Sequence, residues 1–118
     1  MIRINNDVRL NKNFIETIDI DRDEMWIRTS NVTIKITVER RGSESDWNRV
    51  RSNHDDAYLR TIWSRMYSHQ LELADKYFHE WSDKICNGSN IDTNVSKDYE
   101  DDDVNHTVYF KVNVSRPR

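Results

Sequence analysis

Between Asp46 and Asn87 the chain contains neither glycine nor proline, the two residues that most often interrupt a helix. Ser52 followed by Asp55 is typical of a helix start, and Asn87-Gly88 is typical of a helix end. Between these signals apolar residues recur at intervals of three and four, as on one face of a helix. They are Leu59, Ile62, Trp63, Met66, Leu73, Ala74, Tyr77, Trp81 and Ile85. The pattern predicts a helical segment 46–87 with one helix from about Asn53 to Cys86.

The length of this helix is itself a constraint. At ~1.5 Å per residue it would measure about 50 Å, which exceeds the diameter of a typical domain of 118 residues. Two arrangements would accommodate it. Either the helix kinks near Ser68–Gln70, where the apolar pattern lapses, or part of it serves a neighbouring chain.

The residues on both sides of the helix alternate with the period of two that is typical of strands. Strands are predicted at Ile2–Ile4, Val8–Leu10, Phe14–Ile20, Met25–Thr29, 32–39 and His106–Val114. Glu16 interrupts the apolar parity of its strand, which predicts a bulge or an edge position. The last strand returns after the helix and should pair with the N-terminal ones.

The predicted fold class is therefore α+β. An antiparallel sheet of four to six strands packs on one long helix, which is kinked in one of the two arrangements above. An N-terminal meander and a C-terminal strand form the sheet. The length favours a single domain over 1–118. Its expected parts are strands over 1–40, a helical segment over 46–87, an acidic loop over 88–105 and a final strand over 106–114.

Glycine is scarce, with two residues in the chain. A glycine-rich phosphate loop or a Gly-x-Ser-x-Gly nucleophile turn needs more glycine than this. The single cysteine, Cys86, lies at the C-terminal end of the predicted helix, whereas reactive thiols are typically found at helix N-termini. We therefore expect that the protein is not an enzyme and uses no cofactor.

The acidic segment has the spacing of a calcium-binding loop. Oxygen-bearing side chains occupy positions 1, 3, 5, 9 and 12 of such a loop, namely Asp92, Asn94, Ser96, Glu100 and Asp103. Lys97 stands where the loop requires glycine, and a strand is predicted where the second helix should follow. The segment is interpreted as a solvated loop with no metal site. A small metal-dependent enzyme that uses these acidic residues is one alternative function.

A basic segment suggests a second alternative. Arg40, Arg41, Arg49 and Arg51 surround Trp47, and guanidinium groups beside an aromatic ring can hold phosphates and stack on a base. These residues are candidates for binding a nucleic acid or a nucleotide. The same side chains could instead form salt bridges with acidic residues of this chain or of a partner.

The aromatic residues favour a third reading. Seven of the twelve aromatic residues fall between Trp47 and Trp81. The apolar face of the predicted helix spans about half its circumference, whereas packing on one sheet needs a stripe of ~100°. The surplus residues either enter a deep core under a curled sheet or form an interface with another protein. We predict an interface, formed by Tyr67, Leu71, Phe78, Trp81 and Trp47.

Together these features predict a non-enzymatic interaction protein, a homo-oligomer or a binder of another protein. A regulator or inhibitor, such as phages encode, would suit a small domain without a catalytic motif. One cysteine and a polar beginning favour the cytoplasm, or the host cytoplasm for a viral protein. Five Asn-x-Ser/Thr sequons argue the other way, but the chain is rich in these residues. No apolar run approaches the ~20 residues of a membrane helix, so no membrane partner is expected.

Overall fold

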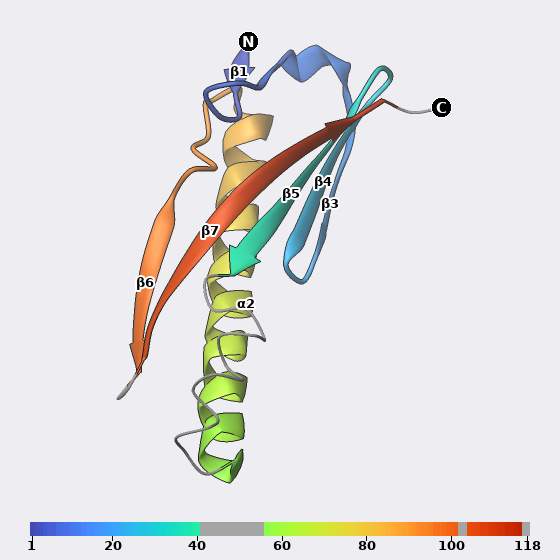
Figure 1. Ribbon diagram of the computed structural model, residues 1–118. Coiled ribbons are helices and arrows are strands. Elements are labelled where there is room, and N and C mark those ends of the chain that lie inside the picture. The colour runs from blue at the N-terminus through green and yellow to red at the C-terminus, as the bar shows by residue number, and fades with distance from the viewer. Residues whose placement is uncertain (41–55, 102–103, 117–118) are drawn as a thin grey trace.

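The computed structural model describes residues 1–40, 56–101 and 104–116 of the chain (Figure 1). It has the predicted α+β architecture, in which one helix packs on an antiparallel sheet. The elements in chain order are β1 (Ile2–Arg3), β2 (Arg9–Leu10), the 3-10 turn η1 (Lys12–Phe14), β3 (Ile15–Asp21), β4 (Glu24–Thr29), β5 (Thr33–Arg40), α2 (Asp56–Cys86), β6 (Ser96–Asp101) and β7 (Val104–Ser115).

The main sheet has five strands in the order β3-β4-β5-β7-β6, and all neighbouring strands are antiparallel. β7 lies between β5 and β6, so the chain's last strand joins the N-terminal meander as predicted. β1 and β2 form a separate two-stranded ribbon near one end of α2 (Figure 1). β3 is an edge strand with a register shift between Ile15 and Thr17. The interruption at Glu16 therefore marks both a bulge and an edge.

Helix α2 is a single uninterrupted element of 31 residues, about 46 Å long at ~1.5 Å per residue. It continues without a break through Ser68–Gln70, where a kink was one of the two predicted arrangements. Among the described residues it begins at Asp56, and the predicted start near Asn53 lies in 41–55, outside them. Gly88 has a φ of 76°, and its N–H donates to the Ile85 carbonyl at 3.0 Å. The Ser89 N–H donates to Lys84 at 2.8 Å, so the helix ends in the glycine-dependent motif expected for Asn87-Gly88.

The core lies between the C-terminal half of α2, the inner face of the sheet and the β1–β2 ribbon. Phe110 of β7 is the aromatic contact of the helix, with ring centroids 4.8 Å from Trp81, 5.7 Å from Phe78 and 5.3 Å from Tyr77. The buried apolar residues are Ile2, Ile4, Leu10, Met25, Ile27, Ile34, Ile36, Ala74, Phe78, Trp81, Ile85, Ile91 and Phe110. Because the set draws on both ends of the chain, the described elements share one core.

The prediction of an acidic loop over 88–105 is wrong in two places. Residues 96–101 form β6, which pairs with β7 from Asp101 opposite Val104 to Ser96 opposite Tyr109. Before it, Ile91 and Thr93 are buried, and their N–H groups donate to Arg3 and Ile4 of the N-terminal ribbon. Charged residues disfavour strands on average, but β7 supplies backbone partners here, and an edge strand tolerates charge.

Candidate binding site

The aromatic residues of α2 do not all lie where the interface prediction placed them. Phe78 and Trp81 are 0% and 2% exposed, so these two residues belong to the core and not to an open surface. Leu71 is half-buried. Trp47 and the side chain of Tyr67 lie outside the described part of the structure. The deep-core interpretation therefore holds for Phe78 and Trp81, which pack on Phe110 of β7 within the core.

The basic segment lies almost wholly outside the described residues. Arg40 is the last residue of β5, but its side chain is not described, and neither are Arg41, Arg49 and Arg51. The hypothesis that this segment binds a nucleic acid or nucleotide therefore stays a prediction.

The acidic segment does not close around an ion in the way a calcium loop does. The Asn94 N–H donates to Asp92 Oδ1 at 3.0 Å, which makes a local turn. Ser96 then begins an extended strand that, at ~3.3 Å per residue, carries Glu100 away from Asp92. Within the described residues no group of three or more His, Cys, Asp or Glu side chains is placed to hold a metal.

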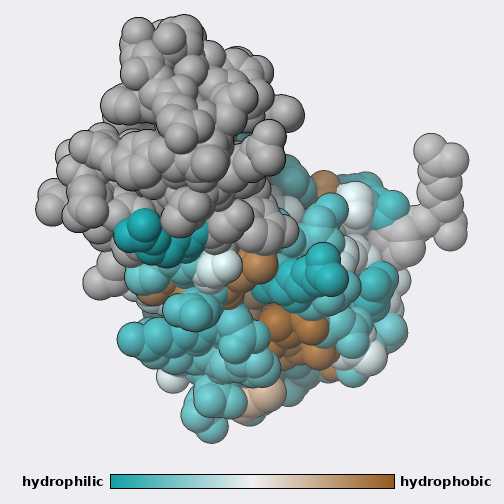
Figure 2. All heavy atoms as spheres, turned by 90° about the horizontal axis from the view of Figure 1, so that it is seen from below, coloured by the Kyte–Doolittle hydropathy of each residue, from teal (hydrophilic) through white to brown (hydrophobic). Residues whose placement is uncertain are grey.

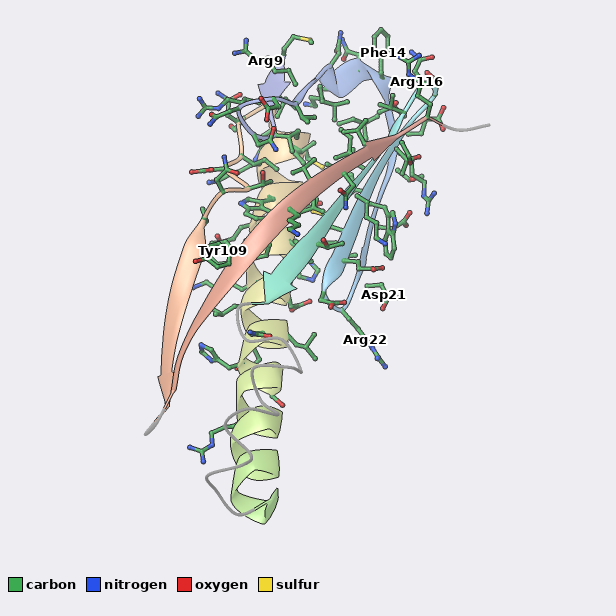
Figure 3. The ribbon with its side chains drawn as sticks, viewed as in Figure 1. Arg9, Phe14, Asp21, Arg22, Tyr109 and Arg116 are labelled. Carbon is green, nitrogen blue, oxygen red and sulfur yellow. The ribbon has the colours of Figure 1, made fainter. Side chains whose placement is uncertain are left out.

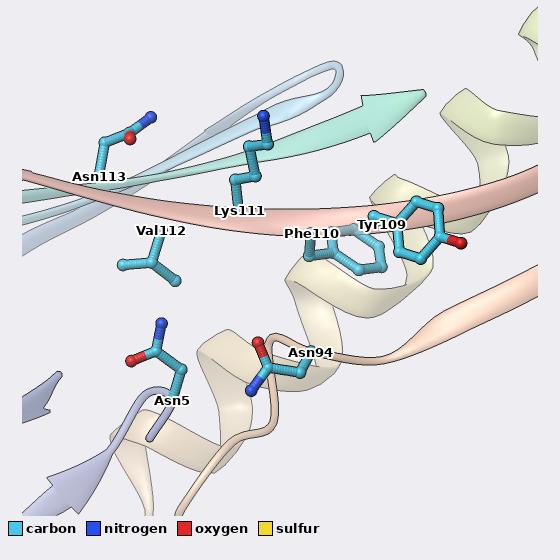
Figure 4. Close-up of a pocket in the computed structure, with 7 residues that line it drawn as sticks. All are labelled: Asn5, Asn94, Tyr109, Phe110, Lys111, Val112 and Asn113. Atoms are coloured by element: carbon cyan, nitrogen blue, oxygen red, sulfur yellow. The ribbon is translucent and has the colours of Figure 1, made fainter. Parts of the chain in front are cut away.

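A pocket of about 460 Å³ lies between β7 and the turn of the N-terminal ribbon (Figure 4). It is lined by Asn5, Asn94, Tyr109, Phe110, Lys111, Val112 and Asn113. Phe110 and Val112 project from β7 to the side on which Asn5 and Asn94 lie, whereas Lys111 and Asn113 project from the opposite side. The pocket therefore combines an apolar surface, a strand backbone and two side-chain amides.

The wall opposite β7 is held in place by hydrogen bonds. Asn5 Oδ1 accepts from the N–H groups of Asp7 at 2.9 Å and Val8 at 2.8 Å, and this defines the turn between β1 and β2. Arg3 N–H donates to Asn90 Oδ1 at 2.8 Å, and Thr93 Oγ1 donates to the Ile4 carbonyl at 3.1 Å. The segment that precedes β6 is thus bound to the ribbon and leaves a gap beside β7.

Of the pocket residues, Asn94 alone was a candidate in the sequence, as an oxygen-bearing position of the calcium-loop spacing. Phe110 and Val112 fall within the predicted strand His106–Val114, and Asn5 falls between the predicted strands Ile2–Ile4 and Val8–Leu10. The pocket residues come together because residues 90–95 cross the end of α2, and no local sequence pattern predicts that path. The one usable signal was Thr93, a small polar residue beside Ile91 in a segment otherwise interpreted as solvated.

No family model, curated protein or solved structure matches this chain. In the part of the chain that the structure describes, no helix has both the length and the apolar character needed to cross a bilayer.

Proposed function

We propose that this chain is a non-enzymatic interaction protein, a regulator or inhibitor that self-associates through the N-terminal half of α2. The observation that carries the proposal is the straight course of the helix. Among the described elements, α2 runs past the end of β5, and its first turns extend beyond the end of the β6–β7 pair (Figure 1). A helix of about 46 Å is longer than the sheet strands that it packs against.

The sequence of the helix supports a partner at this end. Leu59, Ile62, Trp63 and Met66 continue, at spacings of three and four, the stripe that Ala74, Phe78, Trp81 and Ile85 form in the core. An apolar stripe on a helix is stable in water when another surface covers it. Seen from the end at which α2 begins, apolar atoms of described residues are visible among hydrophilic ones (Figure 2).

A second copy is the occupant that we propose for this surface. Two identical stripes can pack around a two-fold axis, so that each helix covers the other and the contacts are reciprocal. Cys86 is a free, exposed thiol, which fits a reducing compartment, and a cytoplasmic location forms part of the proposal.

Sedimentation equilibrium over a concentration series tests the proposal. The chain should dimerise, and Leu59→Lys should shift it towards monomer while the far-ultraviolet circular dichroism is retained. Lys76→Glu, a charge change at an exposed position of the same helix, is the matched control and should leave the dimer intact. A chain that stays monomeric at the highest concentration would contradict self-association.

A further inference from the structure

Part of β7 has a neighbouring strand on one side alone. β6 pairs with β7 only as far as Tyr109, whereas β5 pairs with it as far as Ser115. Beyond Tyr109 no described strand lies on the side away from β5. Every second residue there turns its N–H and C=O to that side, towards the pocket. Such a row of backbone groups is a template for a further strand.

The other edges of the sheet carry features that discourage strand addition, and this part of β7 does not. β3 has a bulge and the acidic residues Glu16, Asp19 and Asp21. β6 has the sequence Ser-Lys-Asp-Tyr-Glu-Asp, in which four of six residues are charged. The part of β7 beyond Tyr109, which β6 leaves unpaired, reads Phe-Lys-Val-Asn-Val-Ser, in which Lys111 is charged and residues 112–115 carry no charge. Charges and bulges are the usual protection of exposed edges, so their absence marks residues 112–115 as a docking edge.

The amides across the gap supply the second half of a peptide site. Because Asn5 Oδ1 is engaged by the turn, the Asn5 Nδ2 group is left as a donor, and it points towards Val112 (Figure 4). Asn94 offers both a donor and an acceptor from the same wall. An extended peptide has backbone N–H and C=O groups along both edges. One edge can therefore pair with β7 while the other meets the two amides.

We propose that this pocket binds an extended segment of a partner polypeptide as an added strand against Val112–Ser115. The side chain that enters the pocket is uncharged and apolar, because it lies over Phe110 and Val112. Among the described side chains that line the pocket, Lys111 is the ionic one, and it projects from the opposite face of β7. A charged side chain would lose its hydration in the pocket without gaining a counter-ion from the described residues on its side of β7. This site is separate from the helix surface proposed for self-association.

Amide hydrogen exchange in the full chain, followed by NMR, tests the proposal with a capped hexapeptide of alternating valine and threonine. The peptide should slow exchange of those amides in 112–115 that point away from β5. The same peptide N-methylated at every residue loses its N–H donors along both edges and should give no protection. Equal protection by both peptides, or none by either at millimolar concentration, would overturn the proposal.

Variants of β7 and its opposite wall sharpen the test. Val112→Lys places a charge in the pocket and should weaken peptide binding by about tenfold or more. Phe14→Lys is the matched control, because Phe14 is 56% exposed and lies outside both the pocket and the proposed docking edge, and should change binding by less than about twofold. If Val112→Lys fails to fold, Asn94→Ala takes its place, because it alters no described core residue. This variant should weaken peptide binding several-fold. Equal affinity of the folded variants would refute the site.

A second copy of the chain is the competing occupant of this edge. If raising the protein concentration alone protects the same amides, and the peptide adds nothing, a neighbouring β7 fills the gap and the peptide proposal fails. The two proposals can fail separately. A chain that dimerises through α2 but binds no peptide contradicts only the peptide site, and a monomeric chain that binds the peptide contradicts only self-association.

Discussion

Gln70 is a polar side chain in the apolar stripe of α2. It is 2% exposed, and its Nε2 group is buried with no hydrogen-bond acceptor in the described structure. A buried donor without a partner costs ~1–3 kcal/mol, and leucine has a similar volume without the donor. We expect Gln70→Leu to raise the free energy of unfolding by about 1 kcal/mol, measured by urea denaturation.

A second substitution at the same position provides the control. Gln70→Glu keeps the shape but adds a buried carboxyl group, and should destabilise the chain at neutral pH. If Gln70→Leu were instead destabilising, the amide would have an acceptor in solution, and the account of this position would be wrong.

Arg22 lies at the tip of the β3–β4 hairpin, where two residues connect Asp21 to Glu24 (Figure 3). Its φ of 55° falls in the left-handed region that glycine adopts without strain. Arg22→Gly should stabilise the chain by up to ~1 kcal/mol, after allowing for the greater freedom of glycine in the unfolded state. Arg22→Ala removes the same charge but keeps the Cβ atom, so thermal melting of this variant should show no comparable gain.

Among the elements, the aromatic contact between α2 and β7 is one of those that hold the helix on the sheet. Phe110 is 5% exposed and touches three aromatic rings of the helix. Phe110→Ala should cost ~3–5 kcal/mol, because the cavity would open at the centre of this cluster. Phe14→Ala is the control, since Phe14 is 56% exposed and should contribute far less. Similar losses for both variants in urea denaturation would contradict the packing described.

The contact with Phe110 also determines the expected effect of replacing Trp81 with alanine. Trp81 packs on Phe110 with ring centroids 4.8 Å apart and is a core residue. Trp81→Ala should therefore lower the stability of the fold directly. Any effect on self-association would follow from that loss, so Leu59 is the better position for testing the interface.

For the chain as a whole, the N-terminal ribbon should fold together with the sheet and helix. Ile4 is fully buried, and its backbone bonds to Thr93 across the chain. Ile4→Ala should lower the unfolding free energy by ~2–5 kcal/mol and shift tryptophan fluorescence and circular dichroism transitions together. Met1→Ala, at an exposed position, is the control. Transitions that separate would show that the ribbon unfolds independently.

Much of this architecture could be predicted because its signals are local. The end of α2 at Asn87-Gly88 follows from glycine's access to positive φ, and Glu16 marks a bulged edge because strand parity is strict. The length of α2 followed from the absence of glycine and proline. The acidic segment could not be read in this way, since a six-residue strand with four charged residues exists only because β7 lies beside it.

The candidate site shows the same division. The sequence by itself determined the fold class, the helix and the strands, because side-chain periodicity and backbone preference act over a few residues. Tertiary structure alone decided that Phe78 and Trp81 enter the core, since their burial depends on Phe110 from the far end of the chain. It also decided that Asn5, Asn94 and the open edge of β7 face one another. The aromatic contacts join residues about thirty positions apart and the pocket joins residues about ninety and one hundred positions apart, and no local pattern encodes either.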